Sequence, residues 1–466
     1  MRLTTGFDHL ERHARQTPER IAITGPGGQI DWRRFQADAA HFAHALGKLG
    51  VGPGRIAVIP HPDPYTHWLL IIACESLGAV SASLAPGDME GGPLLEMADL
   101  VLTEERVAGL PAKSGAAADS HRRHPTDPDT PMRIIRTSGS TGIPKCMMIH
   151  RQAQSHRIAA IAPRNSLSAA SRLYLAYPFS VNLIYYRAEA CLRVGGTVIF
   201  GRASQDLLTY DATHCWLLPR DMERLLQGVR GTWPSPHPLH MSLGGGPVSA
   251  ALHDQTASAL GTKVSLQYGT NETGIVGLLD RDGIGTVDPE VDLKVVDEGG
   301  QPLPEGEPGR FVLRSPEMVT GYLNEPEASA EHFRDGWFYS DDLGVRFPDG
   351  RFRIVGRRSD IINLGGIKIS PYPIEEKLRA NVPGIQEVVV TSILGPLGIE
   401  EVCLAVVPAP TADRSAIVAA IGRETDVSVG QVWLRLFDKL PVGPSGKVQR
   451  AALKEIFAAG RSRGDA

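Results

Sequence analysis

Short apolar runs alternate with helix-like segments along the first part of the chain, and this alternation constrains the fold more than any other feature. Arg55–Pro60 is typical of a strand, His67–Leu77 of a helix and Ala79–Leu84 of the next strand. Further strands are expected, with amphipathic stretches such as Ala250–Leu260 between them, at Leu173–Tyr177, Thr197–Phe200, His214–Leu218 and Val264–Gln267. Because such alternation produces parallel sheets with helices on their faces, the sequence predicts an α/β fold with doubly wound sheets.

Two later segments have a different texture. Gly285–Leu323 consists of short β-branched runs divided by Gly/Pro turns, which predicts a β-rich subdomain. The last 110 residues mix expected strands at Glu387–Val390 and Val402–Val407 with helices, over a length that can fold as a unit. We therefore expect a large N-terminal domain of several subdomains over residues 1–356 and a small α+β C-terminal domain over residues 357–466.

Composition argues against several classes of protein. The formal net charge of −4 leaves no strongly basic surface for nucleic-acid phosphates. The N-terminus lacks an apolar signal core, and the most apolar helix candidate, Trp68–Val80, contains Glu75 and is too short to span a bilayer. The cysteines form no CxxC pair and have no nearby histidine at metal-ligand spacing; they are Cys74, Cys146, Cys191, Cys215 and Cys403. The sequence therefore predicts a cytoplasmic globular protein that acts on small molecules, with no nucleic-acid partner.

A loop rich in hydroxyls and glycines follows the apolar strand expected at Arg133–Arg136. It reads Thr137-Ser138-Gly139-Ser140-Thr141-Gly142-Ile143-Pro144-Lys145. Backbone N–H groups and hydroxyls of such a loop can surround a polyphosphate, while the lysine supplies a point charge. It is not a Walker loop, because two residues separate the last glycine from the lysine. A plain flexible loop is the alternative reading.

At this loop the chain resembles the adenylate-forming superfamily, which holds acyl- and aryl-CoA ligases, luciferases and the adenylation domains of peptide synthetases. In that family the loop contacts the β- and γ-phosphates of ATP. The resemblance therefore implies that Thr137–Gly142 bind ATP and that Lys145 lies near the outer phosphates. Further matches occur in the family's order and spacing, and together they cover about Leu10 to Ala459.

Two of these matches concern adenine and magnesium. Gly244-Gly245-Gly246-Pro247 follows the strand expected at His240–Leu243 and resembles the family's adenine-side loop, with an ordinary strand-to-helix turn as the alternative. Tyr268-Gly269-Thr270-Asn271-Glu272 resembles the segment whose tyrosine stacks on adenine and whose glutamate holds Mg²⁺. A single carboxylate beside a triphosphate suits magnesium. Asn271 replaces the family's usual threonine, so its phosphate role is open.

Two further matches concern the ribose and the domain junction. Gly336–Gly344 resembles the segment whose aspartate binds both ribose hydroxyls, which the alignment assigns to Asp342; its neighbour Asp341 is expected at the surface. Gly356-Arg357-Arg358-Ser359-Asp360 resembles the junction between the large and small domains, where Arg357 would reach ribose and phosphate. Ser359 stands at the family's hinge position in place of Asp or Lys, which leaves the pivot open.

Pro444–Arg450 resembles the loop that carries the family's catalytic lysine, here Lys447. Without its companions such a lysine would be read as a solvated surface residue. With them, the implied catalytic set is Lys447, Glu272 with Mg²⁺, and Lys145. The family rotates its small domain after the first half-reaction, which would bring the Gly365-Gly366 face over the site so that a pantetheine thiol can attack the adenylate.

The residues expected to line the acid pocket follow from the resemblance, when Pro178 is aligned with the proline that the family has in this region. This places Asn182 where amino-acid-activating members keep an aspartate, so an α-amino acid is disfavoured and an aromatic or compact polar acid is favoured. The other expected pocket walls are Val181, Tyr185, Gly244 and Val276. A role of Asn182 as a helix cap is the alternative.

The acceptor is expected to be a thiol. Asn363–Gly366 resembles CoA ligases more than peptide-synthetase domains, which favours CoA; the alternatives are a carrier-protein phosphopantetheine and an amine. A non-catalytic nucleotide-binding homologue is disfavoured by the intact motif residues Lys447, Glu272 and Asp342. A plain ATPase or kinase would release ADP, whereas the expected reaction releases AMP and pyrophosphate.

Overall fold

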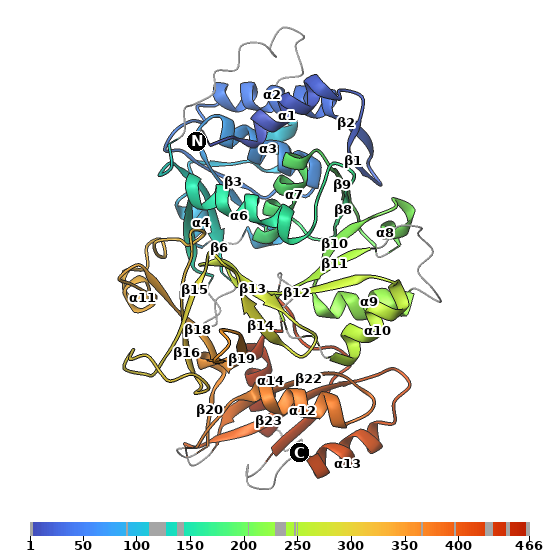
Figure 1. The fold of residues 1–466 in the computed structure, drawn as a ribbon, viewed down its shortest axis with the longest axis vertical. Helices are drawn as coiled ribbons and strands as arrows, with labels where there is room; N and C mark the ends of the chain where they lie inside the picture. Colours follow the sequence, from blue (N-terminus) through green and yellow to red (C-terminus); the bar gives the residue numbers. More distant parts are fainter. Residues whose placement is uncertain are drawn as a thin grey trace.

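The computed structural model describes residues 3–89, 92–110, 127–137, 144–203, 205–228, 239–246, 248, 250–364, 367–395, 398–424, 432–443 and 448–462, and all structural statements concern these residues. From the N-terminus to the C-terminus the chain passes from one end of an elongated molecule to the other (Figure 1). The helices are α1 (Gly6–Gln16), α2 (Trp32–Lys48), α3 (Pro64–Ser76), α4 (Pro93–Glu96), α5 (Glu104–Ala108), α6 (Arg151–Arg164), α7 (Asn182–Val194), α8 (Asp206–Thr209), α9 (Pro219–Gly228), α10 (Ala250–Leu260), α11 (Pro326–His332), α12 (Pro371–Asn381), α13 (Arg414–Glu424) and α14 (Arg450–Ser462), with short 3-10 turns at Pro86–Asp88 and Arg358–Asp360.

The helix ends follow from local chemistry. Asp63 caps α3 by accepting a hydrogen bond from the Thr66 N–H, and a proline at the first helical position has no N–H to leave unpaired. A different helix, α7, ends with Gly195 as its C-cap residue. This glycine adopts a left-handed φ of 78°, which it can do without the steric penalty of a Cβ atom.

The smaller of the two main sheets has the strand order β5-β3-β4-β6-β7 among the described residues. Its strands are β3 (Ile56–Ile59), β4 (Val80–Ser83), β5 (Leu100–Val101), β6 (Pro131–Arg136) and β7 (Cys146–His150). The first four pair in parallel, whereas β6 and β7 are antiparallel. The chain between β6 and β7 is therefore the loop that the sequence assigns to the ATP phosphates.

The larger sheet has 14 strands among the described residues, in the order β15-β16-β18-β19-β14-β13-β12-β11-β10-β8-β9-β1-β2, with β17 paired to β18. Its strands are β1 (Ile21–Gly25), β2 (Gly28–Asp31), β8 (Arg172–Leu175), β9 (Thr197–Phe200), β10 (His214–Leu217), β11 (His240–Leu243), β12 (Lys263–Thr270), β13 (Gly274–Leu279), β14 (Ile284–Val287), β15 (Asp292–Val296), β16 (Gly309–Arg314), β17 (Phe333–Arg334), β18 (Trp337–Arg346) and β19 (Phe352–Arg357).

The parallel part of this sheet confirms the doubly wound prediction. Strands β9, β8, β10, β11 and β12 run in parallel. Adjacent residues of β10 enter different cores, because Trp216 packs in the cluster with α3 and α7 whereas Leu217 packs with residues of α9 and α10. Helices therefore cover both faces, as expected of an α/β layer.

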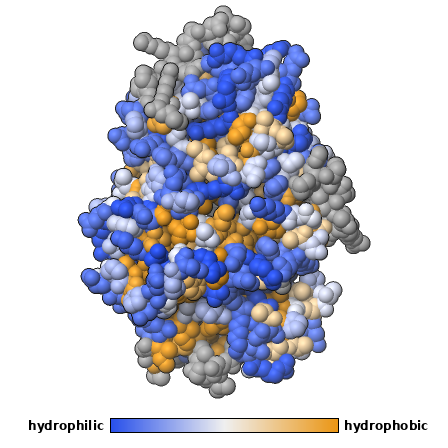
Figure 2. Space-filling view, in the orientation of Figure 1, coloured by the Kyte–Doolittle hydropathy of each residue, from blue (hydrophilic) through white to orange (hydrophobic). Residues whose placement is uncertain are grey.

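The β-rich segment after Gly285 is confirmed, but its strands do not form a sheet of their own. β14 pairs with β13 on one side and with β19 on the other, so the antiparallel strands extend the central sheet. Their inner face is a separate aromatic core around Phe311, Phe338 and Phe352. Figure 2 shows hydrophobic residues gathered across the middle of the molecule, at the level of β12 and β13.

The residues after β19 form two small sheets. β20 (Ile362–Leu364) pairs with β21 (Ile367–Ile369), and β22 (Ile385–Leu394), β23 (Glu400–Pro408) and β24 (Val432–Leu436) form the other. Residues on the two faces of β22 enter separate cores, Val390 with α12 and α13, and Val389 with α14. No helix in the described part of the chain is long and apolar enough to cross a membrane.

Candidate active site

The two residues at the ends of the proposed phosphate loop, Thr137 and Lys145, are hydrogen-bonded to each other. The Thr137 N–H donates to the Lys145 carbonyl at 2.9 Å, and the Lys145 N–H donates to Thr137 Oγ1 at 3.2 Å. These bonds extend the β6–β7 pairing by one step. The predicted phosphate ligands Ser138, Gly139, Ser140, Thr141 and Gly142 lie outside the described residues.

Tyr322 links the predicted lysine to the predicted metal ligand. Lys145 Nζ lies 4.8 Å from the centroid of the Tyr322 ring, and the Tyr322 hydroxyl donates to Glu272 Oε1 at 3.0 Å. Burial and the adjacent Glu272 carboxylate raise the pKa of Tyr322 well above its ordinary value, so its hydroxyl remains a donor. Our reading of the sequence missed Tyr322, because one tyrosine between turns gives no periodic signal.

Ser315–Leu323, which we term the bridging segment, joins two parts of the site that are distant in sequence. The Val319 N–H donates to the Glu272 carbonyl at 2.9 Å, and the Leu323 N–H donates to the Cys146 carbonyl at 2.7 Å. One segment therefore fixes both the Glu272 loop and the strand that follows Lys145.

Asn271, whose phosphate role the sequence leaves open, has a structural partner. Its Nδ2 donates to the Arg136 carbonyl at 3.3 Å, next to Thr137. Thr270 Oγ1 lies 2.9 Å from Thr273 Oγ1, which tightens the turn between β12 and β13. The Asn271 amide thus ties this turn to the end of β6.

Tyr268, Asp342 and Arg357 converge on one carboxylate. The Tyr268 hydroxyl donates to Asp342 Oδ2 at 2.7 Å, and Arg357 Nε donates to Asp342 Oδ1 at 2.8 Å. The strand register brings two of them together, since Asp342 on β18 pairs with Arg357 on β19. The Asp342 carboxylate raises the pKa of Arg357 above its ordinary value, and burial followed by the same carboxylate raises the pKa of Tyr268.

Glycines are required at two predicted nucleotide positions. Strand β12 has an irregular register between Tyr268 and Gly269, and a Cβ on Gly269 would lie 2.4 Å from the Gly274 carbonyl oxygen. Gly245 has a φ of +84°, a conformation that favours glycine. Gly245 and its neighbour Gly246 are exposed at the C-terminal end of β11, whereas Pro247 lies outside the described residues.

The acid-side residues include one correction. Asn182 does not cap α7, because the helix begins at Asn182 and the N-cap residue is Val181, which makes no side-chain capping bond. Asn182 Oδ1 is buried and has no hydrogen-bond partner in the described structure. The expected wall residues Tyr185 and Val276 are 1% and 0% exposed, so both lie inside the protein.

The glycine that follows β11 lies against an aromatic side chain. A Cβ on Gly244 would be 3.4 Å from Trp216 Nε1 and 3.5 Å from the Gln267 carbonyl oxygen. Trp216 Nε1 is itself buried, and it has no acceptor among the described residues. The C-terminal ends of β10, β11 and β12 thus meet here, at the edge of the sheet where ligands bind in open α/β sheets.

Two predicted features cannot be placed by these contacts. Lys447 and the Gly365-Gly366 pair lie outside the described residues. Within the described chain, no group of three or more His, Cys, Asp or Glu side chains is arranged to hold a metal ion. Glu272 is partly exposed and accepts from Tyr322 at one oxygen, so the other oxygen can serve a magnesium ion whose remaining ligands are phosphate oxygens and water.

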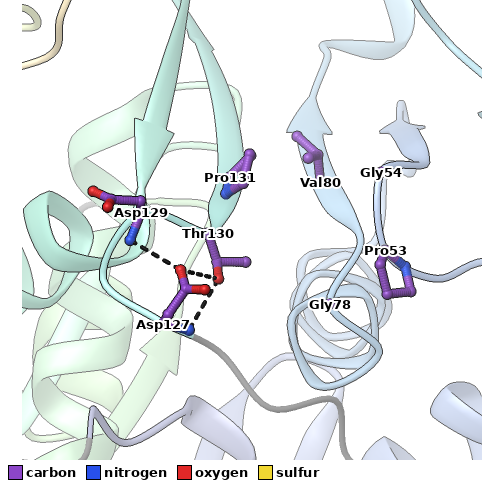
Figure 3. A pocket seen from close by; sticks show the side chains of 8 residues that line it. All are labelled: Pro53, Gly54, Gly78, Val80, Asp127, Asp129, Thr130 and Pro131. Atoms are coloured by element: carbon purple, nitrogen blue, oxygen red, sulfur yellow. Dashed lines mark hydrogen bonds between the residues drawn. The ribbon is translucent and has the colours of Figure 1, made fainter.

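A surface hollow elsewhere on the molecule is not part of this site. It has a volume of about 360 Å³ and is lined by Pro53, Gly54, Gly78, Val80, Asp127, Asp129, Thr130 and Pro131 (Figure 3). Thr130 Oγ1 donates to Asp127 Oδ1 at 3.0 Å, so these polar groups satisfy one another. Pro131 begins β6 and Thr137 follows its end, which separates the hollow from the phosphate loop by about 20 Å of strand.

The fold and these convergent loops define the class of adenylate-forming ligases. The family model described as AMP-binding enzyme matches residues 88–323, just over half of the chain. Feruloyl-CoA synthase of an Amycolatopsis species is 27% identical, with 96% of this chain and 98% of the relative aligned. A medium/long-chain-fatty-acid–acyl-carrier-protein ligase of Mycobacterium tuberculosis is 26% identical, with 99% and 97% aligned.

A solved structure shows the same fold. ATP-bound MatB from Rhodopseudomonas palustris superimposes with a TM-score of 0.83 at 23% sequence identity, and the match covers 97% of this chain and 99% of that one. The chain belongs to the AMP-binding enzyme family, and thus to the adenylate-forming superfamily that its motifs resemble.

Proposed function

We propose that this protein is an ATP-dependent carboxylic-acid ligase that forms an acyl- or aryl-adenylate and transfers the acyl group to a thiol. One observation carries the proposal: Tyr268 and Glu272 lie four residues apart at the end of β12, and each belongs to a separate polar cluster. The first cluster contains Asp342 and Arg357, which suit a ribose; the second contains Lys145, which suits phosphates. A single nucleotide extended along this edge of the sheet would contact both clusters.

The first half-reaction follows from the charges. A carboxylate oxygen of the acid attacks the α-phosphorus of ATP, the new bond is an acyl–phosphate bond, and the bond to the β-phosphate oxygen breaks to release pyrophosphate. Two anions approach each other, so fixed cations are needed where charge accumulates. Lys145 is available for the outer phosphates and Arg357 for the ribose–phosphate side, and we assign Lys447 to the reacting oxygens.

Magnesium would be held by Glu272 together with phosphate oxygens. When bound, it supplies positive charge that offsets the triphosphate. The protein's own contribution is to fix the carboxylate: the Tyr322 hydroxyl occupies one oxygen of Glu272, and the bridging segment holds its backbone carbonyl. The first contact restricts the rotation of the side chain, and the second fixes the backbone that carries it.

The second half-reaction transfers the acyl group. A thiol sulfur attacks the acyl carbon, a thioester forms, and the bond to the AMP oxygen breaks. We assign residues 1–356 to the ATP and acid site and residues 357–466 to a small domain that carries Lys447 and rotates between the half-reactions. Polar contacts join the two parts, since Ser370 Oγ donates to the Val355 carbonyl at 2.8 Å and Lys368 pairs with Glu298 at 2.5 Å. Such contacts can exchange with water during a rotation.

CoA is the proposed acceptor. Two kinds of relative bear on this choice, because one is named for a CoA thioester and another for loading an acyl carrier protein. The Asn363–Gly366 sequence favours CoA, and the phosphopantetheine arm of a carrier protein is the second candidate. An amine acceptor would use the same adenylate.

The test is ATP–pyrophosphate exchange with a library of acids, followed by mass spectrometry of AMP-linked products with and without CoA. We expect acid-dependent exchange, release of AMP and formation of a CoA thioester. Release of ADP would instead identify a kinase or ATPase. Nucleotide binding without exchange for any acid would identify a non-catalytic homologue.

A further inference from the structure

Arg187 places a buried cation on the inner face of α7. The residue is 2% exposed, and its guanidinium donates to Gln267 Oε1 at 2.7 Å from Nη2 and to Asn165 Oδ1 at 3.4 Å from Nη1. Its Nε is buried and has no acceptor in the described part of the chain. Burial lowers the pKa of Arg187 to about 9, which leaves the group charged at neutral pH.

This charge is not balanced by a carboxylate. Arg151, which is also buried, is paired with Glu75, whereas the buried Arg133 and Arg157 donate to hydroxyl and carbonyl oxygens, so the fold contains both kinds of buried arginine. Arg187 forms no ion pair with any described carboxylate, and its partners are neutral amide oxygens. An uncompensated buried charge is costly, and an anion that reached it would remove this cost.

The guanidinium lies at the candidate acid site. Its partner Gln267 is the residue before Tyr268 on β12. The Arg187 Cζ is 5.8 Å from the centroid of the Trp216 ring, and Trp216 Nε1 faces the space beside Gly244. The unpaired groups therefore gather at the C-terminal ends of β10, β11 and β12, where the nucleotide-side residues also begin.

Two more buried polar atoms have no partner in the described structure, one beside the guanidinium and one at the start of α7. Trp216 Nε1 is a donor and Asn182 Oδ1 is an acceptor, and neither is hydrogen-bonded within the described structure. Asn182 is the first residue of α7 and Arg187 is five residues further, which separates them by about 7.5 Å along the helix axis. Because 3.6 residues make one helical turn, the two side chains leave α7 in different directions, and Trp216 is the unpaired group that lies beside the Arg187 guanidinium.

We propose that Arg187, Gln267 and Trp216 form a specificity site for an acid that carries a second anionic group, with Arg187 binding that group at the end distant from the reacting carboxylate. The inference rests on the proposed function and names its substrate class. The donors fit, because Nε and Nη2 are the two N–H groups of the side-on fork that binds a carboxylate, and Nε is unpaired.

A plain fatty acid fits this site poorly. Its alkyl end would displace water without supplying a counter-charge for Arg187, and it would leave the Trp216 donor unsatisfied. A neutral hydroxyl would satisfy the hydrogen bonds but would leave the charge unbalanced. The expected order of preference is therefore a second anion first, a neutral polar group second and an alkyl or unsubstituted aryl end last.

The wild-type enzyme tests this order directly. Exchange kinetics would be measured for pairs of acids that differ only at the far end, namely benzoate with isophthalate and pentanoate with glutarate, with 3-hydroxybenzoate and 3-sulfobenzoate as further arms. We expect kcat/KM to be at least tenfold higher for the acid with the second anion in each accepted pair. Equal or higher values for the unsubstituted acids, or for 3-hydroxybenzoate over both anionic benzoates, would overturn the inference.

A charge-removing variant gives the second test. Arg187→Met keeps an unbranched apolar side chain and removes the charge, so kcat/KM for the dianionic acid should fall at least tenfold while the value for its monoanionic partner is unchanged or rises. Arg172→Met is the matched control, because Arg172 also donates to carbonyl oxygens, at the N-terminal end of β8 and away from the site. An equal loss for both acids in Arg187→Met would assign Arg187 a purely structural role.

Different results would contradict the adenylation reaction and the preference for a second anionic group. Absence of exchange for every acid would count against the adenylation reaction itself. Robust exchange that favours monoanionic acids would leave the ligase assignment intact and reject the second anion. If Arg187→Met does not fold, the wild-type acid pairs still decide the matter, because they require no variant.

Discussion

The nucleotide side and the acid side of the candidate active site differ in how their polar groups are paired. On the nucleotide side, Asp342 accepts from Tyr268 and Arg357, and Glu272 accepts from Tyr322. On the acid side, Arg187 has no acidic partner in the described structure. The first side is thus preorganised by its own contacts, whereas the second depends on its ligand to complete them.

The reacting atoms lie where the two sides meet, so the largest expected effect concerns the lysine assigned to them. Lys447→Ala should reduce adenylate formation on the order of 10³-fold, since a fixed positive charge is lost where two anions react. Thiolation of a supplied acyl-AMP should be largely retained, because the lysine loop would have left the site. Lys454→Ala, an exposed lysine of α14, is the control. Equal loss of both half-reactions would contradict the rotating-domain scheme.

The preorganised side is tested by Asp342→Ala. Tyr268 and Arg357 would lose their shared acceptor, so we expect kcat/KM for ATP to fall about 100-fold and the free energy of unfolding to drop by about 2 kcal/mol. Asp341→Ala is the matched control: its side chain is partly exposed and pairs with Arg358, so it should change neither value appreciably. Exchange kinetics and urea unfolding give the two measurements. A wild-type KM for ATP in Asp342→Ala would mean that this carboxylate does not bind the nucleotide.

The features that the sequence could predict are those with a local pattern. Strands β3, β4, β10 and β12 and helix α3 are confirmed, because apolar periodicity reports burial directly. The grouping of Tyr268, Asp342 and Arg357 agrees with one shared nucleotide, since each lies in a short motif of recognisable residue types. These motifs can be read without knowing the fold, although the binding of ATP itself remains a prediction.

Other features could not be predicted because they depend on packing between distant elements. Tyr322 reaches Glu272 across 50 residues of sequence, and Arg187 reaches Gln267 across 80. A tyrosine after a glycine and an arginine within a helix have no distinctive local pattern. The alternative in which Asn182 caps a helix was wrong by one residue, because a sequence defines helix ends less sharply than helix interiors.

A finer test of preorganisation is Tyr322→Phe, which keeps the ring beside Lys145 and removes the hydroxyl from Glu272. Freed from this bond, Glu272 should rotate more easily, so we expect the Mg²⁺ concentration for half-maximal exchange to rise about tenfold. Tyr65→Phe, which removes a hydroxyl bonded to Asp38, is the control. Unchanged magnesium dependence together with lower thermal stability would show that the Tyr322 hydroxyl only supports the fold.

The smallest expected effect concerns Asn182 and tests its role in acid specificity. Asn182→Asp puts a carboxylate at the start of α7, where Asn182 Oδ1 now lacks a partner. Charge pairing should raise kcat/KM for amino-bearing acids about fivefold relative to their unsubstituted analogues, and repulsion should lower it for dianionic acids. Asn182→Leu separates the loss of polarity from the gain of charge, because it should weaken both groups of acids alike. A substrate profile that neither variant alters would place Asn182 outside the pocket and would leave the proposed roles of Arg187 and Trp216 unchanged.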